Sequence, residues 1–227
     1  MKKMNAQIST KKMVITAMFV AITAVLTFTP IGMIPLPPPL ANATTVHIPV
    51  LLAALIEGPV VGLIVGFSFG VCSLIHAWGT GMIGLTLFFR NPLISILPRL
   101  LVPLIAFGIY QLLQKIDKSK RINNKVQCTI ASILGSFSNT ILCLGMILLI
   151  YYSELTTLVN EMAAASSINI QYIGHPAIWL ISAVGLPNGI SEALAAGVIV
   201  PLVKFALDKV THRKAHKEAF PKEGSEQ

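Results

Sequence analysis

The chain has 227 residues, of which 54% are hydrophobic and only 11% are charged, and its mean hydropathy is +0.76. Soluble domains carry about 25% charged residues, so this composition excludes an ordinary soluble domain. Three cysteines in or beside apolar runs exclude a disulfide scaffold and show no metal-ligand spacing. Apolar runs of about 18–20 residues recur, each long enough to cross about 30 Å of hydrocarbon. We therefore expect an all-α, polytopic membrane protein.

The net charge of +8 is concentrated in three clusters, at the N-terminus, in a central loop at 114–125 and after residue 203. They leave only Arg90 and Arg99 elsewhere. The positive-inside rule predicts that all three clusters face the cytoplasm, where they also attract anionic membrane lipid. No basic stripe alternates with exposed aromatics, so we expect no nucleic acid partner.

Six spans account for the apolar runs, which predicts a six-helix bundle with both termini cytoplasmic. The expected spans are 12–29, 44–56, 60–78, 92–111, 126–152 and 188–207. We divide the chain into a cytoplasmic N-terminal segment (1–11), the six-helix transmembrane domain (12–210) and a charged cytoplasmic tail (211–227).

The connections carry their own signals. The first outer loop (31–40) holds four prolines and cannot stay helical. The apolar stretch 82–89 is expected to lie along the membrane interface, and so is a helix near 154–165. Pro98 and Pro103 should kink the fourth span, and Asn188 is a plausible N-cap of the sixth.

Residues 66–70 (GFSFG) match the nucleophile-elbow pattern G-x-S-x-G. That chemistry needs a strained strand-to-helix turn with a histidine nearby, whereas here the match lies inside an apolar helix. His76 is two helical turns from Ser68, too far along one helix to act as its base. We therefore prefer helix packing, with an intramembrane serine hydrolase as the alternative, and expect no enzyme. The glycines that form this small-residue face are Gly58, Gly62, Gly66 and Gly70.

Ala17 and Ala21 form a second small-residue face, on the first span. Small residues four apart let two membrane helices approach closely. This face can serve either a contact within the chain or the docking of another membrane subunit.

Arg99 lies roughly 10 Å below the outer end of the fourth span, and Glu192 lies at a comparable depth in the sixth. A charge at this depth must face a partner or a wet cavity. Either the two residues neutralise each other, or Arg99 binds a ligand carboxylate while Glu192 orients it or binds a ligand hydroxyl or amide.

Other polar residues cluster in the same outer half. Asn91, Asn139 and Asn188 are candidate binding residues, although each could cap a helix or bond a backbone group. His76 and Trp78 lie at the outer edge, where Trp78 either belongs to the aromatic belt or covers a ligand. Because the inner half is apolar, this asymmetry favours a one-sided binding cup over a channel.

The chain resembles the substrate-binding S components of energy-coupling factor (ECF) vitamin transporters over about residues 10–210. The Ala17-x-x-x-Ala21 face and the proline-rich first loop carry this resemblance. So do HIPVLLAALIEGPVVGLIVGFSFG (47–70), LPRLLVPL (97–104) and NGISEAL (188–194). Glu57 departs from the small or apolar residue expected before the Gly-Pro turn.

The resemblance implies capture of a vitamin near the outer surface of a bacterial plasma membrane. It also implies a transmembrane coupling subunit, docked on Ala17 and Ala21, and two cytoplasmic ATPases. No cofactor is expected in this chain, and ATP would be used by the partners because no G-x-x-x-x-G-K-[ST] is present. Pantothenate is the first candidate, because Arg99 favours an anion and the HIPV stretch looks pantothenate-type. The pyridoxine, hydroxymethylpyrimidine, folate and riboflavin classes are alternatives.

Overall fold

The computed structural model describes residues 10–34, 43–79, 84–117, 122–165 and 168–219. The expected N-terminal segment, except its last two residues, and most of the proline-rich loop lie outside these ranges. The expected tail is helical as far as Ala219.

The described chain is almost entirely helical. Two short strands, β1 (Met33–Ile34) and β2 (Ala43–Thr44), pair antiparallel, with Met33 opposite Thr44. The α-helices are α1 (Thr10–Phe28), α2 (His47–Glu57), α3 (Pro59–Gly79), α4 (Pro92–Ile116), α5 (Asn124–Ile150), α6 (Tyr152–Ala164), α7 (Pro176–Trp179) and α8 (Leu186–Ala219). The 3-10 helices are η1 (Pro30–Gly32), η2 (Gly84–Arg90) and η3 (Ile170–Tyr172), and η4 (Leu180–Gly185) is a π-helix.

Five helices are long and apolar enough to cross a membrane: α1, α3, α4, α5 and the continuous run Pro176–Lys209. The second expected span is instead the 11-residue α2, which at about 1.5 Å per residue is shorter than the hydrocarbon layer. Every residue from His47 to Leu55 is buried, so α2 lies in the core of the bundle.

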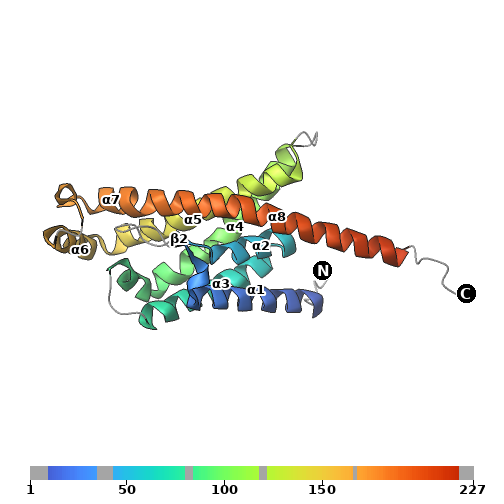
Figure 1. The fold of residues 1–227 in the computed structure, drawn as a ribbon, viewed down its shortest axis with the longest axis horizontal. Helices are drawn as coiled ribbons and strands as arrows, with labels where there is room; N and C mark the ends of the chain where they lie inside the picture. The colour runs from blue at the N-terminus through green and yellow to red at the C-terminus, as the bar shows by residue number, and fades with distance from the viewer. Residues whose placement is uncertain (1–9, 35–42, 80–83, 118–121, 166–167, 220–227) are drawn as a thin grey trace, which may run out of the picture.

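The helices are arranged around α2 and α4. Figure 1 shows α1 and α3 along one side of the bundle, α5 and α8 along the other, and α2 and α4 between them. α3 packs against α1, α2 and α4, while α5 packs against α4 and α8. The first residues of α1 and the last residues of α8 lie at one end, and α6 and α7 lie at the other (Figure 1).

The described lysines lie at the beginnings of α1 and α5, at the end of α4 and in the second half of α8, and these parts of the helices lie toward the same end of the bundle (Figure 1). Arg90 and Arg99 belong to the opposite half of α4 and its lead-in. Cations that gather at one end of an apolar bundle are the pattern that the positive-inside rule describes. The lysines at this end are Lys11, Lys12, Lys115, Lys125, Lys204 and Lys209.

Two prolines inside α4 free backbone carbonyls of that helix. Pro98 has no N–H to donate to the Ile94 carbonyl, and Pro103 has none for the carbonyl of Arg99. α3 approaches α4 closely here, because a Cβ built on Gly66 would collide with the Arg99 carbonyl oxygen. Gly66 therefore permits a contact that any side chain would prevent.

Two other glycines of the expected series line the same side of α3. A Cβ on Gly62 would lie 2.7 Å from Ala54 Cβ, and one on Gly70 would lie 2.8 Å from Ile96 Cα. Gly58 differs from the packing role expected for it. It ends α2 with φ of 99°, and a Cβ there would meet nothing within 4 Å, so it serves the turn between α2 and α3.

One other expectation was wrong. The last span does not begin at Asn188, because the helix already runs from Pro176 through η4. The Leu186 N–H bonds the Ile181 carbonyl, five residues back, and this wider turn precedes Pro187, which cannot donate. The described part of the 82–89 stretch forms η2, in which Phe88 is buried and Leu87 is 41% exposed, and its position along the membrane interface stays a prediction.

We predict that Gly66→Ala lowers the free energy of unfolding by about 1–3 kcal/mol, because the methyl group forces α3 away from α4. Thermal or denaturant unfolding in detergent micelles measures the change. Gly108→Ala in α4 is the matched control, since a Cβ there meets nothing within 4 Å. Equal effects of the two substitutions would show that the close contact is unimportant.

Candidate functional site

A cavity of about 360 Å³ opens between the ends of the helices that lie nearer α6 and α7. Its volume lies within the range of small-molecule sites. Residues from α1, β2, α3, η2, α4, α5, η4 and α8 contribute to the wall. The polar residues of the wall are Thr27, Thr44, Ser73, His76, Thr86, Arg99, Asn139, Thr140, Asn188 and Glu192.

Arg99 enters the cavity from α4 and is only 6% exposed. Its Nη1 donates to the Ile94 carbonyl at 2.8 Å, which is the carbonyl that Pro98 leaves without its usual donor. The guanidinium carbon lies 4.9 Å from the ring centroid of Phe89 and 5.2 Å from that of Phe69. Nε is buried and has no hydrogen-bond partner in the described chain. The protein thus holds Arg99 in place and leaves donors unused.

Glu192 enters the cavity from α8 and is also 6% exposed. Its Oε1 accepts two hydrogen bonds from Thr44, at 2.8 Å from the backbone N–H and 3.1 Å from the hydroxyl. These bonds tie β2 to α8 across 148 residues of sequence. Glu192 is therefore fixed in the wall by a residue that precedes the first buried helix.

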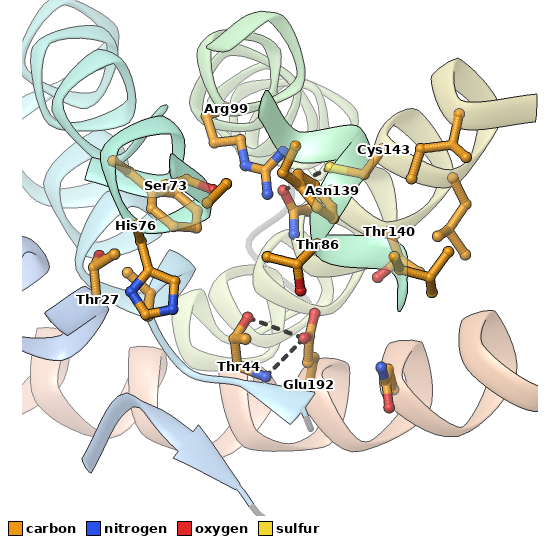
Figure 2. A pocket seen from close by; sticks show the side chains of 18 of the residues that line it. Thr27, Thr44, Ser73, His76, Thr86, Arg99, Asn139, Thr140, Cys143 and Glu192 are labelled. Atoms are coloured by element: carbon orange, nitrogen blue, oxygen red, sulfur yellow. Dashed lines mark hydrogen bonds between the residues drawn. The ribbon is translucent and has the colours of Figure 1, made fainter. Parts of the chain in front are cut away.

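Arg99 and Glu192 face the same cavity from opposite walls (Figure 2). Among the described residues, no carboxylate oxygen lies within 4.0 Å of the Arg99 guanidinium. Asn139 lies between the two charged side chains in this view (Figure 2). The two residues therefore do not neutralise each other by direct contact, which was one of the two expected arrangements.

Two asparagines add amide groups to the wall. Asn139 is buried on α5, and its Oδ1 lies 3.7 Å from Cys143 Sγ, a weak donor. Asn188 is buried on α8, and its Oδ1 has no partner within the described residues. Because the helix continues through this position, Asn188 is not an N-cap. A buried amide without a partner is available to a ligand.

Of the remaining expected site residues, one lines the cavity and the others do not. His76 lines the cavity, with its ring centroid 6.1 Å from that of Phe28. Trp78 is 65% exposed, lies under the Arg90 guanidinium carbon at 5.1 Å and does not line the cavity.

Asn91 also lies outside the cavity wall. Its Oδ1 caps α4 by accepting from the Leu93 N–H, and its Nδ2 donates to the Tyr151 hydroxyl at 3.2 Å. These bonds explain its place at the start of the helix. As ligand contacts, Asn91 and Trp78 stay predictions that the geometry does not support.

Several wall residues were not predicted from the sequence. Thr44 was expected to begin the second span, but it lies in β2, and nothing in the sequence indicated that it would reach α8. Phe69 and Phe89 looked like ordinary apolar residues of a span and a loop. A buried arginine needs aromatic rings or hydrogen-bond acceptors around its guanidinium. The aromatic residues among the apolar side chains that pack near Arg99 were therefore the signal that could have identified these two phenylalanines.

His47 does not line the cavity, but it anchors the segment that carries Thr44 of the cavity wall. It is fully buried, and its Nε2 lies 3.0 Å from Ser136 Oγ, a contact that links the start of α2 to α5. Because His47 follows Thr44 by three residues, this contact helps fix the segment that holds Glu192.

Ser68 offers no support for a nucleophile. It lies inside α3, its hydroxyl donates to the Ile64 carbonyl at 3.0 Å, and it does not line the cavity. A hydroxyl bonded to its own helix four residues back is a common arrangement for serine in a membrane helix.

The small-residue face of α1 lies on the surface. Ala17 and Ala21 are exposed, and the apolar side chains around them are exposed as well. An intrachain contact at these alanines is therefore not what the structure shows. The exposed neighbours on α1 are Met13, Val14, Met18, Ile22 and Val25.

The fold and the cavity together define a multi-pass membrane protein with a cavity at one end, whose largely apolar wall carries several polar side chains. The sequence model of the family described as "ECF transporter, substrate-specific component" matches residues 11–204. The chain belongs to this family.

A curated relative is the pantothenate transporter PanT of Leuconostoc mesenteroides subsp. mesenteroides. The two sequences are 39% identical over 100 residues, which is 42% of this chain and 48% of PanT. The matched region thus spans about half of the length of the relative.

We predict that Ser136→Ala costs about 1–3 kcal/mol of stability, because it leaves the buried His47 Nε2 without a partner. Unfolding in detergent provides the measurement. Ser138→Ala is the matched control two residues away, since the Ser138 hydroxyl donates to Gly135 of its own helix. A Ser136→Ala protein as stable as the control would contradict the anchoring role of His47.

Proposed function

We propose that this chain is the S component of an ECF-type importer and captures pantothenate at the outer face of a bacterial plasma membrane. The observation that carries the proposal is the buried Arg99, which faces a ligand-sized cavity and has no carboxylate partner in the described chain. An arginine in this setting binds a carboxylate well, because its fork of donors matches two carboxylate oxygens. The name of the relative PanT supports pantothenate among the carboxylate-bearing vitamins.

Pantothenate has groups that complement the cavity. It carries a carboxylate at one end, an amide in the middle, and two hydroxyls beside a pair of methyl groups at the other end. In the proposed pose the carboxylate binds Arg99, the amide lies beside Asn139, and the hydroxyls donate to Glu192 and contact Asn188. Leu144 and Val184, which also line the cavity, provide apolar surface for the methyl groups.

Other vitamin classes fit these features less well. A neutral or cationic pyridine or pyrimidine would leave the buried guanidinium without an anion, which is costly at this depth. The large flat rings of riboflavin and folate need open aromatic surfaces, whereas Phe69 and Phe89 already flank Arg99.

The membrane orientation follows from the charges. In the proposed topology the lysine-rich end faces the cytoplasm, both termini lie there, and the cavity opens outside. α2, with β2 leading into it, completes a sixth crossing inside the protein, where it needs no contact with lipid.

The proposed partners are a transmembrane coupling subunit and two cytoplasmic ATPases. The exposed face of α1 around Ala17 and Ala21 is the proposed docking surface for the coupling subunit, because small residues let a second helix approach. This chain would hold no cofactor, and the ATPases would bind the nucleotide.

We predict that purified protein binds labelled pantothenate with a saturable one-to-one isotherm and that Arg99→Gln weakens binding roughly 100-fold or more. Equilibrium dialysis or calorimetry in detergent measures both affinities. Arg90→Gln is the matched control, because Arg90 lies near the same end but outside the cavity wall. Absence of saturable binding, or an equal effect of both substitutions, would refute the proposal.

We also predict that Ala17→Trp and Ala21→Trp reduce recovery of the coupling subunit with the tagged protein roughly tenfold or more, because overpacking a close contact costs about 1–3 kcal/mol. Pantothenate affinity should stay unchanged. Ile141→Trp, at an exposed apolar position of α5, is the control for bulk at the surface. Undiminished recovery of the complex would exclude this face as the docking surface.

A further inference from the structure

The two carboxylate oxygens of Glu192 have different environments. Oε1 accepts both hydrogen bonds from Thr44. Oε2 has no hydrogen-bond partner in the described chain and is not among the buried unpaired atoms, so it is accessible from the cavity. Figure 2 shows this second oxygen directed into the space below Thr86 and Asn139. The cavity wall therefore offers a ligand one hydrogen-bond acceptor, Oε2, on a carboxylate that Thr44 holds in position through Oε1.

The cavity wall holds one positive and one negative side chain of the Lys, Arg, Asp and Glu types within the described residues, Arg99 and Glu192. They enter from α4 and α8, on opposite sides of the space (Figure 2). An anionic group of a ligand is attracted to the Arg99 side. The opposite end of the same ligand then lies against Glu192, which accepts hydrogen bonds from hydroxyls but repels a second anion.

We propose that Glu192 restricts the cavity to ligands with a single anionic group, so that pantothenate is accepted and its phosphate ester, 4′-phosphopantothenate, is rejected. This inference rests on the proposed function, because it takes the pose with the carboxylate at Arg99. A phosphate ester on the terminal hydroxyl replaces a hydrogen-bond donor by a group with a charge of about −1.5 to −2. Both changes act against binding beside a carboxylate whose position Thr44 fixes.

Exclusion of the phosphate ester by its size would respond differently to a substitution of Glu192 than exclusion by its charge. A bulky neutral group at the terminal hydroxyl would be excluded equally whether residue 192 is acidic or an amide. Charge repulsion, in contrast, disappears when Glu192 becomes glutamine, which keeps the shape of the side chain and an oxygen that can accept from Thr44. The two causes are therefore separable by one substitution.

The test is competition against labelled pantothenate by pantothenate and by 4′-phosphopantothenate, on purified full-length protein. The wild type should bind the phosphate ester roughly 100-fold more weakly, or worse, since like charges in contact are strongly unfavourable. Glu192→Gln should reduce this ratio by about tenfold or more. Glu161→Gln is the matched control, because it removes an exposed acidic group of α6 that lies outside the cavity wall, and it should leave the ratio unchanged.

The outcomes separate this inference from the proposed function. If labelled pantothenate does not bind the wild type, the proposed function fails, and this inference fails with it. If pantothenate binds and the wild type accepts the phosphate ester equally well, the inference alone is overturned, with no need for a variant. A ratio that is large in the wild type and unchanged in Glu192→Gln assigns the rejection to size and also overturns it.

Discussion

The structure depends on a guanidinium held inside an apolar bundle without an acidic partner in the described chain. An arginine in a transmembrane helix costs about 3 kcal/mol near the centre of the bilayer. α4 offsets part of this cost within its own sequence, because Pro98 frees the Ile94 carbonyl and Arg99 follows directly to bond it. Two phenylalanine rings flank the cation. What remains is a positive charge directed at a cavity, which an anionic ligand would complete.

The packing of the bundle explains how this charge stays available. The glycines of α3 bring that helix against the backbone of α4 at Arg99, so α4 is supported from behind. On the other wall, Thr44 holds Glu192, and His47 fixes the segment that carries Thr44. The two charges are therefore held apart by separate supports, and neither has to cross the cavity to find a partner.

The sequence predicted the helical class, most of the spans and the gathering of polar residues toward one end of the bundle, because the length of an apolar run and a charge inside it are local signals. It also selected Arg99, Asn139, Asn188, Glu192 and His76, which the fold brings to one cavity. It did not predict the Thr44 bond to Glu192, since no local pattern indicates a contact across 148 residues. It misplaced the start of the last helix, because Pro187 normally favours a helix start, and the π-turn before it lets the helix continue. Asn91 and Trp78 share the polar or aromatic character of the site but serve a cap and an exposed stack.

The most direct test is native mass spectrometry of the protein purified from cells without added ligand, compared with Arg99→Gln prepared in the same way. We expect the wild type to retain one small carboxylic acid with the mass of pantothenate, and the variant to be empty. A neutral or cationic molecule in the wild type, or an acid retained equally by the variant, would contradict the claim that Arg99 binds a ligand carboxylate in this cavity.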